Sequence, residues 1–268
     1  MLYSKKYFKN ENLDWVVFVH GAGGSSAIWF KQVKAFKKYF NVLLIDLRGH
    51  GKSTDILRHY YKEKYTFRTV SNDVLQVMKD QNIEKAHFVG VSLGTIIIRT
   101  IADIRPDVLQ SSVMCGAITR MNKRSRILVW LGHTFKRIVP FMWLYKLFAW
   151  IIMPRKNHSE TRMLFIKDAK KLARKEFLKW FRLTYDINPL LRYFKEKEME
   201  SPTLYVMGSE DHMFLPPVKK MVENFERSTL RIIEDCGHVC NVEQPDIFNK
   251  IAIKFLREQS SKTELAMK

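Results

Sequence analysis

Residues 90–94 (GVSLG) hold a serine, Ser92, between two glycines that stand two positions away on either side. The apolar run AHFV precedes them and the helical pattern TIIIRTIADI follows, so the sequence predicts Ser92 on a tight turn from a strand into a helix. The backbone of such a turn is strained, and glycines at its flanks avoid collision with the neighbouring chain. The turn raises the hydroxyl above the edge of the sheet and points the positive end of the helix at developing negative charge. The pattern therefore predicts that Ser92 is a nucleophile.

A serine hydroxyl is nearly inert at neutral pH, so it needs a histidine as base and a carboxylate that orients the histidine. Asp211 follows the apolar run TLYVM, which places it on a loop at the carboxyl edge of the predicted sheet. His238 follows the last predicted strand. We therefore predict Ser92 as the nucleophile, His238 as the general base and Asp211 as the acid that orients the imidazole.

Other residues of the same types leave alternatives open. Glu210 is a second candidate for the acid, and His212, His20 and His50 are candidates for the base. Each is the weaker choice. His212 adjoins the acid in the sequence, while His20 and His50 stand in turns where a structural role accounts for them.

Attack on a carbonyl group produces an oxyanion that needs two backbone N–H donors, one of them from the residue after the nucleophile. That residue is Leu93. The second donor is expected from the loop His20–Gly24 (HGAGG), with Ala22 as the candidate, because its glycines let the backbone approach a substrate. The loop lacks the GxxxxGK[ST] and GxGxxG spacings of nucleotide sites, and the three cysteines match no zinc pattern. We expect the reaction to need neither a cofactor nor a metal.

Short apolar, β-branched runs that alternate with longer helical patterns are typical of βα units around a mostly parallel sheet. Six runs are predicted as strands buried on both faces: Trp15–His20, Val42–Asp46, Ala86–Gly90, Ser112–Gly116, Thr203–Gly208 and Leu230–Glu234. Helices are predicted over Ser25–Phe40, Phe67–Gln81, Ser92–Ile104, Val218–Phe225 and Pro245–Arg257. A chain of 268 residues is long enough for one such α/β domain with an insertion.

The alternation stops between the fourth and fifth predicted strands. Residues 121–200 show helical patterning without a convincing strand, and we interpret them as a helical cap inserted into a core domain of residues 1–120 and 201–268. Arg120–Glu200 holds 20 Lys and Arg against 7 Asp and Glu, hence +13 of the net charge of +19. No acidic residue occurs from Val108 to Ser159. This balance indicates an anionic surface or partner, or good solubility.

Five segments spread from Val16 to Phe248 together resemble the successive motifs of α/β-hydrolase fold proteins: VFVHGAGGSSAIW, LLIDLRGHGKS, FVGVSLGT, MGSEDHMF and CGHVCNVEQPDIF. The resemblance is to the serine carboxylesterase and lipase branch. It implies the same triad and the same oxyanion donors as the residues themselves predict: Ser92, Asp211, His238, Ala22 and Leu93. It also implies that the cap is inserted after the sixth strand of the family's sheet.

The resemblance further implies structural roles at the turn after the second predicted strand for Asp46, Arg48, His50 and Gly51. Family members usually begin with a two-stranded hairpin, but only about 14 residues precede Trp15, so a shortened edge is expected here. Serine rather than aspartate at position 92 disfavours the epoxide hydrolase and dehalogenase branches. Hydrolysis through an acyl-enzyme is favoured.

The segment Arg126–Met153 combines aromatic residues with scattered Lys and Arg, and it leaves three interpretations open. The aromatic side chains pack the cap onto the core, shield an apolar acyl pocket, or lie on anionic lipid. Its most apolar part, Ile138–Met153, has 16 residues and is shorter than the roughly 20 that span a bilayer. A second segment, Lys167–Arg182, is predicted to form one amphipathic cationic helix, whose basic face is solvated or contacts a membrane. Nucleic-acid binding is a lesser alternative, because no recognised motif accompanies the charge.

These patterns predict a serine hydrolase that cleaves carboxylic esters with apolar acyl chains. The alternatives are a thioester, lactone, amide, monoacylglycerol or carbon–carbon bond as substrate, or a non-catalytic membrane- or partner-binding protein that retains the fold. The segment MLYSKKYFKNENLDW lacks the apolar run of a secretion signal, so we expect a cytoplasmic location, with peripheral contact at the inner membrane surface as an option. The three cysteines are too few for a disulfide framework and are predicted to be free thiols.

Overall fold

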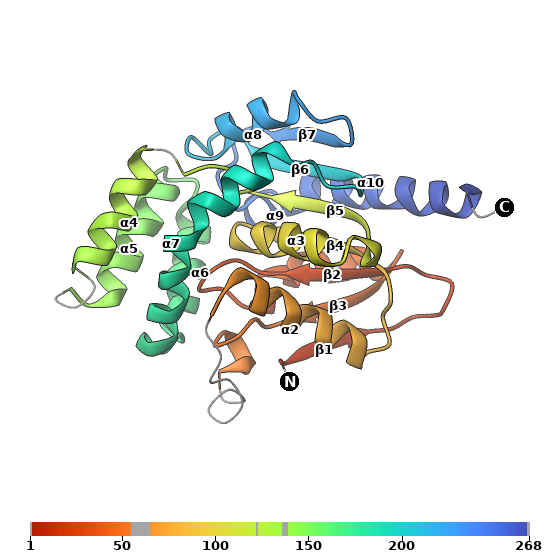
Figure 1. Cartoon of the computed structure of the whole chain (residues 1–268), viewed down its shortest axis with the longest axis horizontal. Coiled ribbons are helices and arrows are strands. Elements are labelled where there is room, and N and C mark those ends of the chain that lie inside the picture. The colour runs from red at the N-terminus through yellow and green to blue at the C-terminus, as the bar shows by residue number, and fades with distance from the viewer. Residues whose placement is uncertain (1, 55–64, 122, 136–138, 267–268) are drawn as a thin grey trace.

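A seven-stranded sheet forms the centre of the molecule (Figure 1). The computed structural model describes residues 2–54, 65–121, 123–135 and 139–266. The strands are β1 (Ser4–Tyr7), β2 (Trp15–Val19), β3 (Asn41–Ile45), β4 (Ala86–Val91), β5 (Leu109–Cys115), β6 (Thr203–Gly208) and β7 (Ser228–Ile233). Their order is β1-β3-β2-β4-β5-β6-β7; β1 is antiparallel to β3, and the other neighbours are parallel. The predicted α/β class with a mostly parallel sheet is confirmed.

Among the described strands, the edge strand β1 is the one that the sequence did not predict. Its residues, SKKY, lack an apolar run, and the strand is held by its pairing with β3, where Ser4 lies opposite Ile45 and Tyr7 opposite Val42. Lys5 is exposed on this edge, and lysines on an edge strand oppose pairing with another chain. Within the described residues the N-terminal edge, expected to be shorter than the hairpin usual in the family, consists of one strand.

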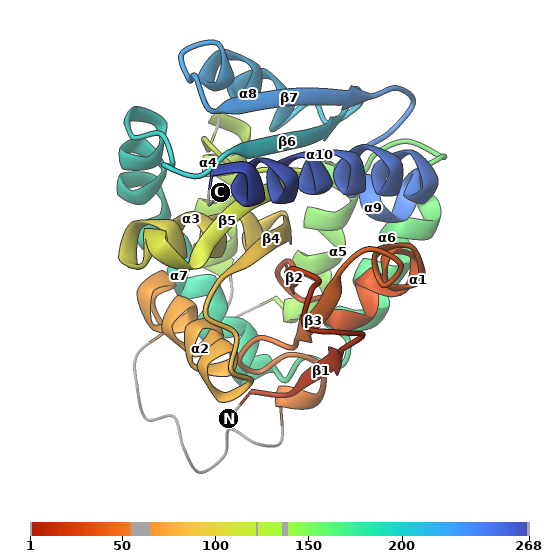
Figure 2. The same cartoon turned by 90° about the vertical axis from the view of Figure 1, so that its right-hand side faces the viewer.

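Helices cover both faces of the sheet. They are α1 (Phe30–Phe36), α2 (Phe67–Asp80), α3 (Leu93–Ile104), α8 (Leu215–Val222), α9 (Cys240–Glu243) and α10 (Pro245–Ala266). Alternate residues of a strand face the two layers: in β2, Val17 and Val19 pack in one core cluster with α2, α3 and α8, while Val16 and Phe18 pack in another with α1 and α10. Figure 2 shows α2 and α3 on the side of the sheet opposite α1. Burial on both faces explains why β2 to β6 read as continuous apolar runs. The prediction of burial on both faces is wrong for β7, because this strand lies at the edge of the sheet and its Thr229 and Arg231 are exposed.

Some helix boundaries differ from those predicted. The predicted helix Ser25–Phe40 is a 3-10 turn, Ser26–Trp29, followed by the shorter α1. Helix α8 begins at Leu215 with prolines in its first turn, where proline costs no hydrogen bond. Helix α10 continues to Ala266.

Between β5 and β6 the described residues form helices and no strand. The helices are α4 (Lys123–Phe135), α5 (Phe141–Ile152), α6 (Ser159–Ala169) and α7 (Arg174–Glu196). We call residues 121–200 the insertion. Figure 1 shows its helices gathered at the end of the sheet to which the parallel strands point. A separate apolar cluster holds them together: Tyr145, Ala169, Leu172, Phe177 and Phe181.

One prediction within the insertion is wrong, because Lys167–Arg182 is not a single helix. Helix α6 ends at Ala169, and α7 begins at Arg174 after a turn. Leu172 lies in that turn and is buried in the insertion's cluster with Phe177. The turn lets α6 and α7 face the same cluster from two directions, which a straight helix would not permit. The apolar spacing within the segment predicted the inward positions but not the break.

Candidate active site

Ser92 occupies the turn between β4 and α3 in a backbone conformation that few residues other than glycine adopt (φ 53°, ψ −119°). A Cβ atom on Gly94 would collide with the carbonyl oxygen of Val19. A Cβ atom on Gly90 would lie 2.5 Å from Cδ1 of Ile98. These contacts are the steric reason for the two glycines that flank the serine, and they explain why the chain can turn so tightly here.

The structure brings three of the predicted residues together at the carboxyl end of the sheet. Ser92 Oγ donates a hydrogen bond to Nε2 of His238 at 3.0 Å, and Nδ1–H of His238 donates to Oδ2 of Asp211 at 2.7 Å. The bond to the carboxylate places the proton of a neutral imidazole on Nδ1 and turns the lone pair of Nε2 toward the serine. Asp211 and His238 are buried, whereas Ser92 is half-buried. This arrangement supplies what base-assisted attack by a serine requires.

The loops after β5 and β6 fix the positions of the acid and the base. Oδ1 of Asp211 accepts the N–H of Phe214 at 3.1 Å, so both carboxylate oxygens have a donor. The ring of Phe214 lies 5.0 Å from the His238 ring. Gly116 has a φ of 52°, and a Cβ atom there would lie 3.1 Å from Nδ1 of His238. A larger residue at position 116 would therefore displace the imidazole.

The alternative acid, Glu210, has other partners. It pairs with Arg155, Asn157 and His158 of the insertion, and His158 Nε2 lies 2.7 Å from Glu210 Oε2. These partners hold the pKa of Glu210 below its usual value, against the effect of burial. Glu210 thus anchors the insertion to the loop that carries Asp211. The alternative base His212 is exposed.

The two other histidines, His20 and His50, are buried and hydrogen-bonded through both ring nitrogens. His20 Nδ1–H donates to the carbonyl of Gly21 at 2.7 Å, and its Nε2 accepts a backbone N–H at 3.0 Å. His50 Nε2 accepts the N–H of Gly23 at 2.9 Å, while its Nδ1–H donates to the Arg48 carbonyl at 2.8 Å. Burial lowers the pKa of His20, and burial together with the neighbouring His20 lowers the pKa of His50 to about 3. Both rings are therefore neutral, and their hydrogen bonds hold the glycine-rich loop in place.

That glycine-rich loop lies against the nucleophile. A Cβ atom on Gly21 would lie 3.2 Å from Cβ of Ser92 and 3.9 Å from the backbone nitrogen of Leu93. The loop therefore passes close to Ser92 and Leu93 at the residue that directly precedes Ala22. Both predicted N–H donors thus belong to backbone segments that meet at Ser92.

Tyr145, on α5, is a contact of this loop that the sequence did not predict. Its phenol donates to the carbonyl oxygen of Ala22 at 2.8 Å, and its ring stacks on Phe165 with 4.6 Å between centroids. Burial raises the pKa of Tyr145, so the phenol keeps its proton. No local pattern signals this contact, because Tyr145 lies 123 residues from Ala22 and belongs to a helix rich in aromatic residues.

His158 is the second unpredicted residue, and it connects the insertion to both loops of the acid and the base. Its Nε2 lies 3.8 Å from Oε2 of Glu243, and the same carboxylate oxygen accepts the N–H of Gly237 at 2.6 Å. Glu210, its other partner, immediately precedes Asp211. The insertion is therefore attached directly to the framework of the site.

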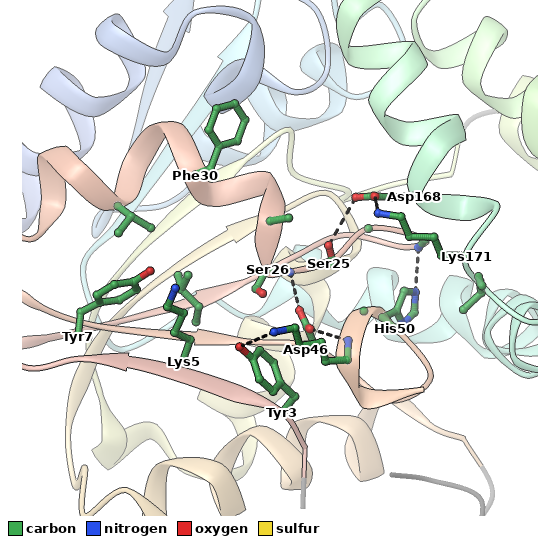
Figure 3. A pocket seen from close by; sticks show the side chains of 18 of the residues that line it. Tyr3, Lys5, Tyr7, Ser25, Ser26, Phe30, Asp46, His50, Asp168 and Lys171 are labelled. Atoms are coloured by element: carbon green, nitrogen blue, oxygen red, sulfur yellow. Dashed lines mark hydrogen bonds and ion pairs between the residues drawn. The ribbon is translucent and has the colours of Figure 1, made fainter. Parts of the chain in front are cut away.

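A cavity of about 770 Å³ lies beside the glycine-rich loop but does not include Ser92, Asp211 or His238 (Figure 3). Its wall contains five lysines: Lys5, Lys34, Lys37, Lys52 and Lys171. Asp46 also lines it, but its carboxylate is occupied, since it accepts the N–H groups of Ser26 at 2.7 Å and Lys52 at 2.9 Å. Asp46 thus holds the turn after β3.

Within the described ranges, no group of three or more His, Cys, Asp or Glu side chains is arranged to hold a metal ion. Cys115, Cys236 and Cys240 are free and buried, as predicted.

A mostly parallel sheet with a strained serine turn after β4 and helices inserted after β5 defines a class of protein. The family model described as alpha/beta hydrolase fold matches residues 14–245. The chain belongs to this family, and the family assignment makes it a hydrolase-type enzyme. The resemblance noted from the sequence motifs is confirmed.

Known proteins are similar to the chain over most of its length or over part of it. RutD of Stutzerimonas stutzeri, named as a candidate carbamate hydrolase, is 26% identical over 264 residues, which cover 94% of each chain. The 3-oxoadipate enol-lactonase 1 of Acinetobacter baylyi is 39% identical over 84 residues, or 31% of this chain and 29% of that protein. A thermophilic esterase of Thermogutta terrifontis superposes with a TM-score of 0.79 at 18% identity, over 97% of this chain and 94% of that one. At that identity the superposition shows the fold.

Proposed function

We propose that this protein is a serine hydrolase that cleaves carboxylic esters through an acyl-enzyme on Ser92. The observation that carries the proposal is the unbroken chain of hydrogen bonds from Ser92 through His238 to Asp211, with distances of 3.0 and 2.7 Å. Membership of a hydrolase family supports it. So does the strained backbone at Ser92, because such strain is kept where it serves a function.

In the proposed reaction, Ser92 Oγ attacks the ester carbonyl while His238 Nε2 takes the hydroxyl proton. The buried carboxylate of Asp211 stabilises the imidazolium that forms. As the tetrahedral intermediate collapses, the carbon–oxygen bond to the alcohol breaks, and His238 returns the proton to the departing alcohol. Water, deprotonated by His238, then attacks the acyl-enzyme and releases the acid and free Ser92.

The backbone N–H groups of Ala22 and Leu93 are proposed to bind the oxyanion. Loss of one such donor typically costs about 10²- to 10³-fold in rate, so the position of the Ala22 peptide is critical. Three contacts hold the backbone on either side of the Ala22 N–H. His50 accepts the N–H of Gly23 and Tyr145 donates to the carbonyl of Ala22, both in the peptide that follows, and Gly21 packs on Ser92.

We further propose that residues 121–200 act as a cap on a core of residues 1–120 and 201–268, and that the acyl group bound beneath the cap is apolar. Half-buried apolar side chains from both parts pack on the core cluster that includes Phe214: Leu93, Ile118, Met121, Ile151 and Ile152. Half-buried apolar surface of this kind is what an acyl chain would cover.

Lactones and carbamates are the competing substrates, because the same attack opens a cyclic ester or a carbamate. The names of the similar proteins favour them as the second choice. The shape of the pocket decides among them rather than the triad.

The test is the specificity constant kcat/KM for p-nitrophenyl esters from acetyl to dodecanoyl, with a lactone and a carbamate measured in parallel. Turnover that rises toward longer acyl chains and disappears in Ser92→Ala is the expected result. Turnover confined to the lactone or the carbamate would retain the Ser92 mechanism and replace the ester. Ester turnover that survives in Ser92→Ala would contradict the proposal.

A further inference from the structure

The tryptophans of this protein divide into two groups. Trp29 and Trp180 are buried and Trp15 is half-buried, all packed against the core. The other three are 63%, 70% and 54% exposed: Trp130, Trp143 and Trp150. All three exposed tryptophans lie on α4 and α5 of the insertion. Exposed tryptophan is costly in water, so its concentration on two helices indicates a surface that meets something else.

Helix α5 shows the pattern most clearly. Its exposed apolar residues, Trp143, Leu147 and Trp150, follow one another at spacings of four and three, so they form a stripe along one side. The opposite side carries the buried Tyr145 and Ala149. Helix α5 is thus apolar on the side that packs inward and on the side that faces solvent.

Helix α4 adds to the same end of the molecule. Ile127 and Trp130, three residues apart, are exposed on it. Gly132 of α4 and Phe148 of α5 both contact Phe181 of α7, and Figure 1 shows the two helices together at the end of the molecule opposite the C-terminus. We define the tryptophan face as the exposed apolar residues of these helices: Ile127, Trp130, Trp143, Leu147 and Trp150.

One ring of the tryptophan face is held in place. The guanidinium of Arg162 lies 3.7 Å from the ring centroid of Trp150, and Arg162 is itself buried and bonded to the carbonyl of Met153. The contact therefore holds the Trp150 ring in a fixed orientation, with 54% of the residue exposed. Such preorganisation lowers the entropic cost of inserting the ring into a partner.

The segment that carries this face holds charge of one sign. Nine Lys and Arg and no acid occur from Arg120 to Ser159. Arg126 adjoins Ile127 and Lys146 adjoins Leu147, and both are exposed. A second copy of the chain is disfavoured as the partner, because a two-fold contact would bring this positive face against itself. The aliphatic Leu147 and Ile127 offer nothing to a nucleic acid. Aromatic and aliphatic residues ringed by basic ones suit the head-group region of an anionic bilayer.

We propose that the tryptophan face docks this protein onto the surface of a bilayer that contains anionic lipid, with α5 lying along the head-group level. The 12 residues of α5 extend for about 18 Å, which suits a helix lying in the plane of the surface. Within the described ranges, no helix combines the length and apolar content needed to cross a bilayer. The proposal is independent of the ester chemistry, since none of its residues is Ser92, Asp211 or His238.

The experiment is flotation of the full-length Ser92→Ala protein with vesicles of phosphatidylcholine alone or with a quarter of phosphatidylglycerol. The Ser92→Ala background prevents any turnover from altering the vesicles. Binding is expected to the anionic vesicles and to be at least about tenfold weaker to the neutral ones or in high salt, because each basic residue near the surface contributes about 1 kcal/mol.

Two variants locate the contact. Trp143→Gln with Leu147→Gln is expected to weaken binding to anionic vesicles by about tenfold or more, since these side chains supply the inserted apolar surface. Phe30→Gln with Ile247→Gln, a matched pair of exposed apolar residues on the core, is expected to have no effect. Arg126→Glu with Lys146→Glu, both at exposed positions, tests the charge separately and is expected to weaken binding as well.

Several results would overturn the proposal. The first is no binding to anionic vesicles, and the second is equal binding to anionic and neutral vesicles. The third is an equal loss of vesicle binding in the two double variants to glutamine, the one on α5 and the one on the core. A protein that elutes as a dimer, becomes monomeric in Trp143→Gln with Leu147→Gln and ignores vesicles would instead assign the face to self-association.

Discussion

The phenol of Tyr145 donates a 2.8 Å hydrogen bond to the carbonyl oxygen of Ala22, and the two residues belong to different parts of the molecule. Tyr145 lies on α5 of the insertion, and Ala22 lies on the glycine-rich loop beside Ser92. The insertion therefore reaches the peptide that directly follows the Ala22 N–H proposed to bind the oxyanion. The opposite side of α5 carries the exposed tryptophan stripe, so one helix connects the outer surface to the site.

Tyr145→Phe removes this hydrogen bond and keeps the ring that stacks on Phe165. We expect kcat to fall about fivefold with little change in KM, because a hydrogen bond of this kind is worth about 1 kcal/mol and the oxyanion forms only during the reaction. Tyr193→Phe removes the hydroxyl of a tyrosine on α7 that bonds Asp103 far from Ser92, and should leave kcat unchanged. Equal effects of both substitutions in ester kinetics would argue against a positioning role for Tyr145.

Asp211→Asn is expected to lower kcat by about 10⁴-fold, because an amide no longer holds the His238 tautomer that accepts the serine proton. Glu210→Gln alters the neighbouring carboxyl, which bonds Asn157 and His158 instead of His238. It should change kcat only a few-fold. A larger loss in Glu210→Gln than in Asp211→Asn would reverse the assignment of the acid.

Gly94→Ala should destabilise the fold although alanine is the better helix former. Its Cβ atom would collide with the backbone carbonyl of Val19, which cannot move without shifting β2. We expect a loss of about 1–3 kcal/mol in the free energy of unfolding, seen as a Tm lower by several degrees. Gly24→Ala, where the nearest atom is 3.4 Å from the added Cβ, is the matched control and should stay within about 0.5 kcal/mol of the wild type. Similar Tm values for both variants would refute the steric explanation.

The buried His50 predicts a dependence of stability on pH. The pKa of His50 in the folded protein is about 3, below the ordinary value of 6.5. Between pH 6.5 and pH 3 the imidazole is therefore protonated in the unfolded chain but neutral in the folded one. The free energy of unfolding should therefore fall as the pH drops from 6.5 toward 3, with a contribution from His50 of about 1.4 kcal/mol per pH unit.

Urea titrations of His50→Gln at several pH values between 6.5 and 4.5 test this directly. The slope of the unfolding free energy against pH should be smaller than in the wild type by about 1.4 kcal/mol per pH unit, which corresponds to the uptake of one proton fewer on unfolding. His212→Gln, at an exposed position, should leave the slope unaltered. An unchanged slope in His50→Gln would show that the ring is protonated in the folded protein.

The sequence predicted the elements whose residues carry their own signal. The strands β2 to β6 read as apolar runs because both of their faces are covered. Ser92 stood out because the two glycines that its tight turn requires lie beside it in the sequence. Strand β1 was missed because SKKY forms a strand only through its pairing with β3. The turn at Leu172 was missed because it depends on packing against Phe177 and not on a helix-breaking residue.

Contacts between distant parts of the chain account for what the sequence could not predict at the site. Tyr145 and His158 reach Ala22 and Glu210 across 123 and 52 residues, and each is one of many similar residues in its segment. The sequence could not predict that Trp143 and Trp150 are exposed, because the spacing of apolar residues marks a helix face but does not show whether other residues cover it.

Labelling with a fluorophosphonate tests the central claim most directly, because the reagent reports an activated serine whatever the natural substrate is. We predict that the serine oxygen displaces fluoride and that one label appears on the tryptic peptide of residues 86–99, which contains Ser92. The label should be absent in Ser92→Ala and greatly slowed in His238→Gln, which lacks the base. Absence of labelling in the wild type, or labelling that persists in Ser92→Ala, would contradict the account.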